Sequence, residues 1–172
     1  MTDDFEAIRQ TGDWSVNPWW LKDNWLEVIP RTPDQVQAAF DYLRQVFDSY
    51  WLRAYKGEPI ENLLLRSVLY GGDAFRRAHL ILLAERLQRL KETPGFHVVM
   101  KALKGRGESD AADMELELAD IFFQEGFQIV FPIPKSSKGK GPDIRISKGN
   151  EKLTIWTAPL KLETVLHSLR TE

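Results

Sequence analysis

The spacing of apolar residues divides this 172-residue chain into two parts. Between residues 32 and 103 apolar side chains recur at steps of three and four, which is the period of a helix that buries one face. After Gly126 they occur in short runs and alternating stretches, which is the pattern of β-strands. The sequence therefore predicts a mixed α+β protein, with a helical region over residues 1–104 and a small α/β unit over residues 105–172.

Capping and breaking residues set the limits of the predicted helices. Thr32 and Pro33 suit the N-cap and the first position of a long helix, which we expect to end near Gly57. The helical region is predicted to contain helices at residues 32–57, 59–70, 73–92 and 96–103.

Residues 1–31 are predicted to be an irregular arm, because Pro18 and Pro30 interrupt regular structure. The arm carries four of the six tryptophans of the chain, Trp14, Trp19, Trp20 and Trp25. Rings this close together either pack across the helices or form a strip that binds a protein partner or a second copy of the chain. The residues do not distinguish these two interpretations.

Composition excludes several classes of protein. The chain has no cysteine, which excludes disulfide frameworks, thiolate metal sites and cysteine nucleophiles. Its N-terminus is acidic and does not show the pattern of a secretory signal. No apolar run reaches the roughly 18–20 residues that a membrane span needs. We therefore expect a cytoplasmic protein that does not enter a membrane.

Positive charge is concentrated in one segment, although the net charge of the whole chain is −2. Between Pro134 and Lys152 there are six basic residues against two acidic ones. The basic residues are Lys135, Lys138, Lys140, Arg145, Lys148 and Lys152. This segment is either a solvated loop or a surface along which a nucleic-acid backbone lies, because phosphate contacts are made mainly by Lys and Arg.

The α/β unit is predicted to begin with a helix. Ser109 or Asp110 can cap it, and Gly126 stands at the position that commonly ends such a helix. The four residues from Lys148 to Glu151 are predicted to form a tight hairpin turn. The expected order is helix, strand, strand, strand, helix, at residues 109–125, 127–131, 143–147, 152–157 and 160–170.

This order of elements, with Pro142-Asp143 at the head of the second strand, resembles the PD-(D/E)XK, or restriction-endonuclease-like, family over about residues 109–158. In that family a helix glutamate, a strand aspartate and a glutamate two residues before a lysine surround one or two Mg²⁺ ions. Carboxylate oxygens hold such a cation, which polarises the phosphodiester and activates water. The resemblance implies that Glu115 and Asp143 are the metal-ligand and catalytic candidates, with Mg²⁺ as the cofactor.

The third predicted strand departs from the family pattern. Alternation places Leu153, Ile155 and Thr157 on one face and Thr154, Trp156 and Ala158 on the other. The family's Glu-X-Lys then falls on Trp156-Thr157-Ala158, which supplies neither a carboxylate nor an amine. The family core also continues with a further helix and strand, whereas residues 159–172 provide room for one short helix. The resemblance therefore implies a degenerate and shortened nuclease core.

Other side chains offer partial replacements or simpler roles. Lys135, Lys138, Lys152 and Lys161 could supply the missing amine. Glu117 cannot join Glu115, because it lies about 200° around the helix. Glu115 could instead be a solvated acid favoured by the helix dipole, and Asp143 a turn residue that binds nearby backbone. The three histidines, His79, His97 and His167, lie on separate predicted helices and are expected to hold no metal.

Three functions follow from these patterns. The favoured one is a degenerate nuclease-like module that binds nucleic acid or a protein without cleavage. The second is a helical adaptor or assembly protein that acts through residues 14–103. The third is a Mg²⁺-dependent nuclease whose active-site residues have moved to neighbouring elements.

Overall fold

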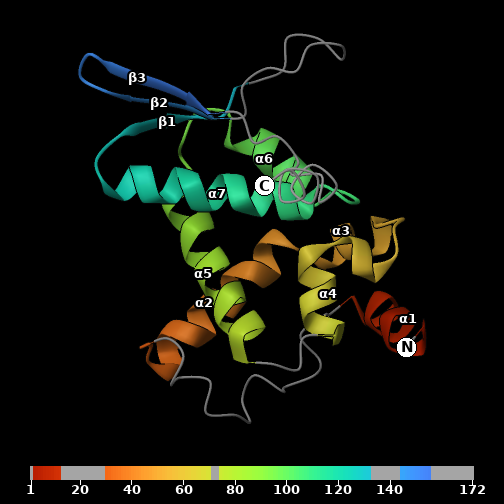
Figure 1. Cartoon of the computed structure of the whole chain (residues 1–172). Helices are drawn as coiled ribbons and strands as arrows, with labels where there is room; N and C mark the ends of the chain where they lie inside the picture. Colours follow the sequence, from red (N-terminus) through yellow and green to blue (C-terminus); the bar gives the residue numbers. More distant parts are fainter. Residues whose placement is uncertain (1, 13–29, 71–73, 133–143, 156–172) are drawn as a thin grey trace, which may run out of the picture.

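The computed structural model describes residues 2–12, 30–70, 74–132 and 144–155 (Figure 1). Its helices are α1 (Thr2–Thr11), α2 (Pro33–Val46), α3 (Ser49–Ala54), the 3-10 helix η3 (Pro59–Glu61), α4 (Leu63–Tyr70), α5 (Ala74–Leu90), α6 (Phe96–Leu103) and α7 (Ser109–Gln124). Its strands are β1 (Gln128–Val130), β2 (Ile144–Lys148) and β3 (Glu151–Ile155). This arrangement confirms the mixed α+β fold, with helices first and strands last. The helix predicted at 160–170 lies outside the described residues.

A helix break separates α2 from α3, so the prediction of one helix over residues 32–57 is wrong. Thr32 caps α2 as expected, with Gln35 completing a capping box. The backbone N–H of Phe47 donates to Leu43 (2.7 Å), and Asp48 then starts α3 by accepting a hydrogen bond from the Trp51 N–H at 2.8 Å. Apolar spacing continues across this break, because Phe47 and residues beyond it remain buried.

Helix α1 occupies part of the segment predicted to be irregular, so that prediction is wrong for residues 2–11. Between Thr2 and Thr11 there is no proline or glycine to interrupt a helix. Ile8 is buried in the hydrophobic core, and α1 contacts α3. The tryptophans of the predicted arm, at residues 14, 19, 20 and 25, lie outside the described residues.

Asn62 interrupts the helix predicted at 59–70 and divides it into η3 and α4. Its side chain is fully buried. The carbonyl oxygen accepts from the N–H of Leu64 (3.0 Å), while the amide nitrogen donates to the carbonyl of Leu103 at 3.0 Å and that of Gly105 at 3.3 Å. One side chain therefore caps α4 and holds the end of α6.

The start of α7 also differs from the prediction. Glu108, rather than Ser109 or Asp110, stands at the N-cap. Ser109 Oγ accepts a hydrogen bond from the Leu63 N–H at 2.8 Å, and the Asp110 carboxylate forms an ion pair with Arg66. Both side chains therefore join α7 to α4 instead of capping their own helix.

Helix α7 lies between the sheet and α5 (Figure 1) and contacts α5, α6, β1 and β2. One hydrophobic cluster extends from Ile8 to Ile146 and includes Leu87 and Leu116 on the facing helices. The division of the chain at residue 104 stays a prediction. Among the described helices, none combines the length and the apolar character that a membrane crossing requires.

The three strands form an antiparallel sheet in the order β1-β2-β3. Ile146 pairs with Ile129 on one side and with Leu153 on the other, and Ile144 pairs with Ile155. Ile129, Ile144 and Ile146 are buried, so this face of the sheet covers the core. Lys148 pairs with Glu151 across the two-residue turn Gly149-Asn150, and the φ of 59° at Gly149 suits glycine. The predicted hairpin is confirmed, and the register places Leu153 and Ile155 on one face as predicted, although Leu153 is 49% exposed.

The glycine turn between α5 and α6 lies against the segment that follows β1. Gly95 has a φ of 80°, and a Cβ placed on it would lie 1.7 Å from the carbonyl oxygen of Phe131. The Phe131 N–H donates to the carbonyl of Pro94 at 2.9 Å. Close approach and left-handed backbone together require glycine here.

Candidate functional sites

Helix α7 carries different chemistry on two sides. Phe122 marks the side toward the sheet, because its ring packs edge-on against Phe127, with centroids 5.5 Å apart. Glu115 is half-buried and lies seven residues before Phe122, which places it on the same side of the helix. Glu117 lies on the side toward α5, where it forms an ion pair with Arg86 at 3.0 Å. The two glutamates therefore face different ways, as the helical geometry predicts.

The side of α7 toward α5 is held by a chain of ion pairs. Arg89 binds Asp120 through two hydrogen bonds of 2.6 Å each. Arg31 also makes a bidentate contact with Glu85, at 2.6 and 2.9 Å. The Glu85 carboxylate in turn lies 3.8 Å from the Arg89 guanidinium. We call these four residues, together with Arg86 and Asp113, the α5–α7 clamp.

The buried part of the clamp centres on Arg86 of α5. The side chains of Arg86 and Asp113 are each about 9% exposed, and their nearest charged atoms are 3.5 Å apart. Asp113 also lies 2.9 Å from Nε2 of His79. His79 thus has an acidic neighbour that its position in the sequence does not reveal. Because these charges compensate one another inside the protein, the clamp is a structural contact between helices and not a surface for a charged ligand.

Hydrogen bonding keeps the exposed end of the clamp ionised. The hydrogen bond from Arg31 holds the pKa of Glu85 below its usual range, helped by the positive charges of Arg31 and Arg89 and opposed by burial. The hydrogen bond to Asp120 raises the pKa of Arg89 in turn. Glu85, Arg31 and Arg89 are therefore charged at neutral pH.

The face of the sheet that points away from α7 is polar and positively charged. It carries Gln128, Val130, Arg145, Ser147, Lys152 and Thr154. Arg145 and Lys152 are both exposed and lie on neighbouring strands. None of the six side chains on this outer sheet face is acidic. Two of the six predicted nucleic-acid contacts therefore share a surface.

Lys148, a third predicted contact, is not on that surface. Its Nζ donates to the carbonyl of Glu125 at the end of α7 (2.7 Å) and lies 4.9 Å from the centre of the Phe127 ring. It therefore helps to terminate α7 and anchors the hairpin. The other predicted contacts, Lys135, Lys138 and Lys140, lie outside the described residues.

The predicted metal site is described only in part. Glu115 lies on the sheet side of α7, whereas Asp143 and Trp156 fall just beyond the last described pair, Ile144 and Ile155. Within residues 2–12, 30–70, 74–132 and 144–155 no group of three or more His, Asp or Glu side chains is placed to hold a metal. The assignment of Glu115 and Asp143 as Mg²⁺ ligands stays a prediction.

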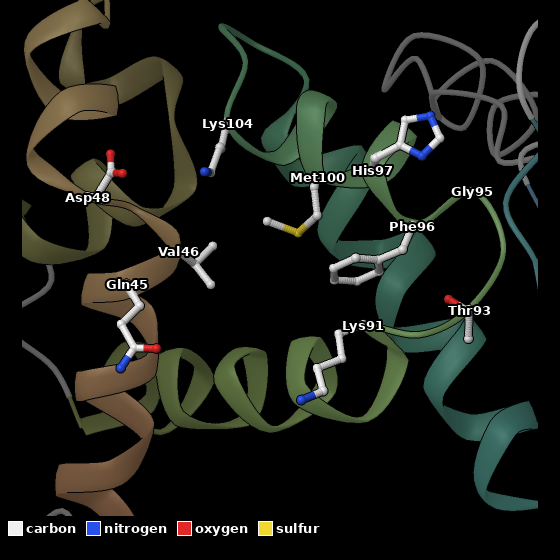
Figure 2. Close-up of a pocket in the computed structure, with 10 residues that line it drawn as sticks. All are labelled: Gln45, Val46, Asp48, Lys91, Thr93, Gly95, Phe96, His97, Met100 and Lys104. Atoms are coloured by element: carbon white, nitrogen blue, oxygen red, sulfur yellow. The ribbon is translucent and has the colours of Figure 1, made fainter.

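An open groove of about 490 Å³ lies between α2, α5 and α6, and its lining includes His97, one of the three histidines named in the sequence. Figure 2 shows Val46, Phe96 and Met100 projecting into it from α2 and α6. Lys91 and Lys104 reach it from opposite sides. Two helices distant in the sequence, α2 and α6, thus build one apolar floor with two cations beside it.

The acidic residue that lines the groove is engaged in the fold. Asp48 Oδ1 accepts the hydrogen bond from the Trp51 N–H that starts α3. By contrast, no ion pair or hydrogen bond of the ammonium groups of Lys91 and Lys104 occurs within the described part of the chain, where Lys104 Nζ lies 5.8 Å from the centre of the Phe47 ring. The groove therefore presents positive charge beside an apolar surface.

Lys104 also lines a second hollow, of about 210 Å³, on its other side. Trp51 and Tyr55 supply the aromatic wall of this hollow, and Lys56 and Arg106 stand at it as cations. Arg106 is paired with Glu61 at 2.7 Å. The linings of the two hollows share Lys104, at the end of α6.

Sequence reasoning misses both the clamp and the groove. The clamp leaves a local signal, since Asp113 and Asp120 stand seven residues apart on one side of α7 and Arg86 interrupts the apolar run of α5. The groove leaves none, because its lining comes from residues 45–48, 91–97, 100 and 104.

Comparisons of the chain with protein-family models, with curated proteins and with solved structures found no match.

Proposed function

We propose that the α/β unit at residues 105–172 binds nucleic acid without cutting it. The order of α7, β1, β2 and β3 is the one expected for a nuclease-like core. Glu115 lies on the same side of α7 as Phe122, whose ring packs against Phe127 just before β1. These features support the proposed relationship to the PD-(D/E)XK family. The proposed binding does not depend on a metal, because it requires only contacts to the phosphate backbone.

The outer sheet face is the observation that carries this proposal. Arg145 and Lys152 place two positive charges on adjacent strands, and hydroxyl groups of Ser147 and Thr154 stand beside them. Such groups make most contacts to phosphate in complexes with nucleic acids. Lys135, Lys138 and Lys140 precede β2 in the sequence and add three charges to the same unit.

Binding without cleavage follows from the third strand. Trp156 and Ala158 stand where the family places a carboxylate and an amine. A hard cation held for catalysis needs several oxygen ligands, and the nuclease-like pattern supplies two candidates, Glu115 and Asp143. The residues therefore do not fit a working metal centre, and we derive no hydrolytic step.

Fluorescence polarisation with labelled single-stranded DNA, duplex DNA and RNA tests the binding proposal. We expect the affinity to fall steeply between about 50 and 200 mM salt, because binding releases counterions. The double charge reversal Arg145→Glu, Lys152→Glu should weaken binding about tenfold. The slope of log affinity against log salt concentration should become less steep by roughly one to two, because fewer counterions are released.

The double variant Lys91→Glu, Lys104→Glu is the matched control, because it changes the total charge equally on a different surface. It should bind nucleic acid as the native chain does. Equal weakening by both variants would show a response to overall charge and would overturn the assignment to the outer sheet face.

Incubation of the protein with plasmid, single-stranded DNA and RNA in the presence of Mg²⁺ or Mn²⁺ tests the absence of cleavage. We expect intact substrates under all these conditions. Cleavage that is abolished by Asp143→Ala would replace this proposal with that of an active nuclease.

A further inference from the structure

The groove between α2, α5 and α6 has the features of a binding surface that is separate from the outer sheet face. Its apolar floor consists of Val46, Phe96 and Met100, which converge on one space (Figure 2). A volume of about 490 Å³ falls within the range of about 300–1,000 Å³ that is typical of ligand sites. The floor therefore offers room for a bulky apolar group.

The charged residues beside the floor indicate which charges a ligand should carry next to its apolar group. Lys91 and Lys104 approach from opposite sides, and the one carboxylate in the lining, that of Asp48, caps α3. A ligand that carries acidic groups on both sides of its apolar part complements this arrangement. A basic ligand would place like charges together.

The shape of the surface favours an extended ligand over a compact one. Lys104 is shared by the groove and by the hollow lined by Trp51 and Tyr55, where Lys56 adds a further positive charge and Arg106 is paired with Glu61. An extended chain with acidic side chains along its length matches the three lysines of the two linings, Lys91, Lys104 and Lys56. A small organic anion would fill the first hollow alone.

The aromatic rings distinguish a peptide from a nucleic acid. Single-stranded nucleic acids bind to basic grooves by stacking bases on free aromatic faces. Here the Trp51 indole donates to the Lys104 carbonyl at 3.0 Å and packs against Phe47 and Tyr55, with centroids 4.9 and 5.7 Å away. Tyr55 is itself buried. These two rings belong to the packing of α3, and the Phe96 ring of the floor packs against Phe131, with centroids 6.5 Å apart. The methionine and valine of the floor suit an apolar side chain.

From these observations we propose that the groove binds an extended acidic peptide segment of another protein, which inserts one bulky apolar side chain onto Val46, Phe96 and Met100. Carboxylates on either side of that anchor bind Lys91 and Lys104. The proposal does not rest on nucleic-acid binding by the α/β unit, and either can fail without the other.

A fluorescein-labelled synthetic peptide of alternating Glu and Asp with a central Leu-Phe pair tests this proposal by polarisation titration. We expect saturable binding to the full chain. Replacement of the Leu-Phe pair by Ser-Ser should weaken binding at least about tenfold, and Lys91→Glu with Lys104→Glu should do the same, because each reversed charge turns an attractive contact into a repulsive one.

The variant Arg145→Glu, Lys152→Glu is the matched control, since it changes the charge equally but lies on the sheet; it should bind the peptide as the native chain does. Lys91 is exposed, so the single Lys91→Glu variant should fold, and circular dichroism of each variant checks this. Absence of saturable peptide binding, or equal binding of the Ser-Ser peptide, would overturn the proposal. Binding of a single-stranded oligonucleotide that Lys91→Glu abolishes would assign the groove to nucleic acid instead and would also overturn it.

Discussion

Single residues fix the points at which distant elements meet, and Gly95 is the clearest example. Its left-handed backbone turns the chain from α5 into α6 while the Phe131 carbonyl lies against it. Any side chain here meets two penalties, the cost of the left-handed conformation and the overlap with a backbone oxygen. Because the overlap is with backbone, either the Gly95 turn or the segment around Phe131 must shift to accommodate a side chain.

Gly95→Ala should therefore lower the free energy of unfolding by at least about 2 kcal/mol, as measured by urea denaturation. Gly149→Ala is the control: that glycine also has a positive φ, of 59°, but a Cβ would have no atom within 4 Å. It should lose only about 1 kcal/mol. Equal losses would show that the approach of Phe131 contributes nothing.

Local chemistry at the residue scale is partly visible in the sequence. Thr32 and Gly126 can be assigned to helix ends because their roles depend on immediate neighbours. Asp48 and Asn62 cannot be assigned in this way, since both stand inside apolar patterns that continue through the break. Asn62 also depends on the carbonyls of Leu103 and Gly105, which lie about forty residues away.

At the scale of elements, the α5–α7 clamp joins the helical region to the α/β unit. Asp120 is 4% exposed and satisfies both Arg89 and Gln124, whose side-chain amide donates to it at 2.8 Å. Removing the carboxylate leaves two donors without their acceptor. The Arg89 side chain is 35% exposed and can recover part of this loss from water.

Asp120→Ala should lower the free energy of unfolding by about 2 kcal/mol, below the roughly 3–5 kcal/mol of a fully buried pair. A double-mutant cycle with Arg89→Ala should give a coupling of about 1–2 kcal/mol. Asp41→Ala removes an exposed pair with Arg44, at 3.1 Å, and should change the free energy by less than about 1 kcal/mol. A cycle with no coupling would contradict the clamp.

Glu85 gives the same contact a pH dependence. Its pKa is lowered in the folded protein from an ordinary value of 4.5, mainly by the hydrogen bond from Arg31. The stabilisation is therefore complete above pH 4.5 and is lost as the pH falls through the lower folded pKa. Glu85→Gln should be less stable than the native chain at pH 7, and the difference should shrink in acid. Urea denaturation across this range measures it, and a constant difference would exclude an ionic contribution.

At the scale of the whole molecule, the hydrophobic core crosses the boundary predicted at residue 104. Leu116 of α7 belongs to the same cluster as Leu87 of α5. A fragment of residues 105–172 would expose this apolar side of α7 and leave Asp113 and Asp120 without their arginines. We expect the isolated fragment to show no cooperative thermal transition by circular dichroism, and a mixture with residues 1–104 to recover one. A cooperative transition of the fragment alone would establish an independent domain.

The sequence predicts the fold class and the helices α5, α6 and α7 to within about two residues, because periodicity reports which side of each element is buried. It does not predict the breaks that divide the two earlier helices. It cannot predict which buried sides face each other. Arg89 and Asp120 are ordinary charged residues until α5 and α7 are placed side by side, and Met100 is an ordinary core position until α2 lies opposite it. The groove and the clamp therefore emerge only from the arrangement of the helices.

The packing of α2 on α5 sets a sequence of events during synthesis. The apolar stripe of α2 ends at Val46, but its partner helix is complete only at Leu90. At a translation rate of about 5–20 residues per second, that stripe stays uncovered for several seconds as the chain leaves the ribosome. The N-terminal helices therefore complete their packing only after the later parts of the chain have been made.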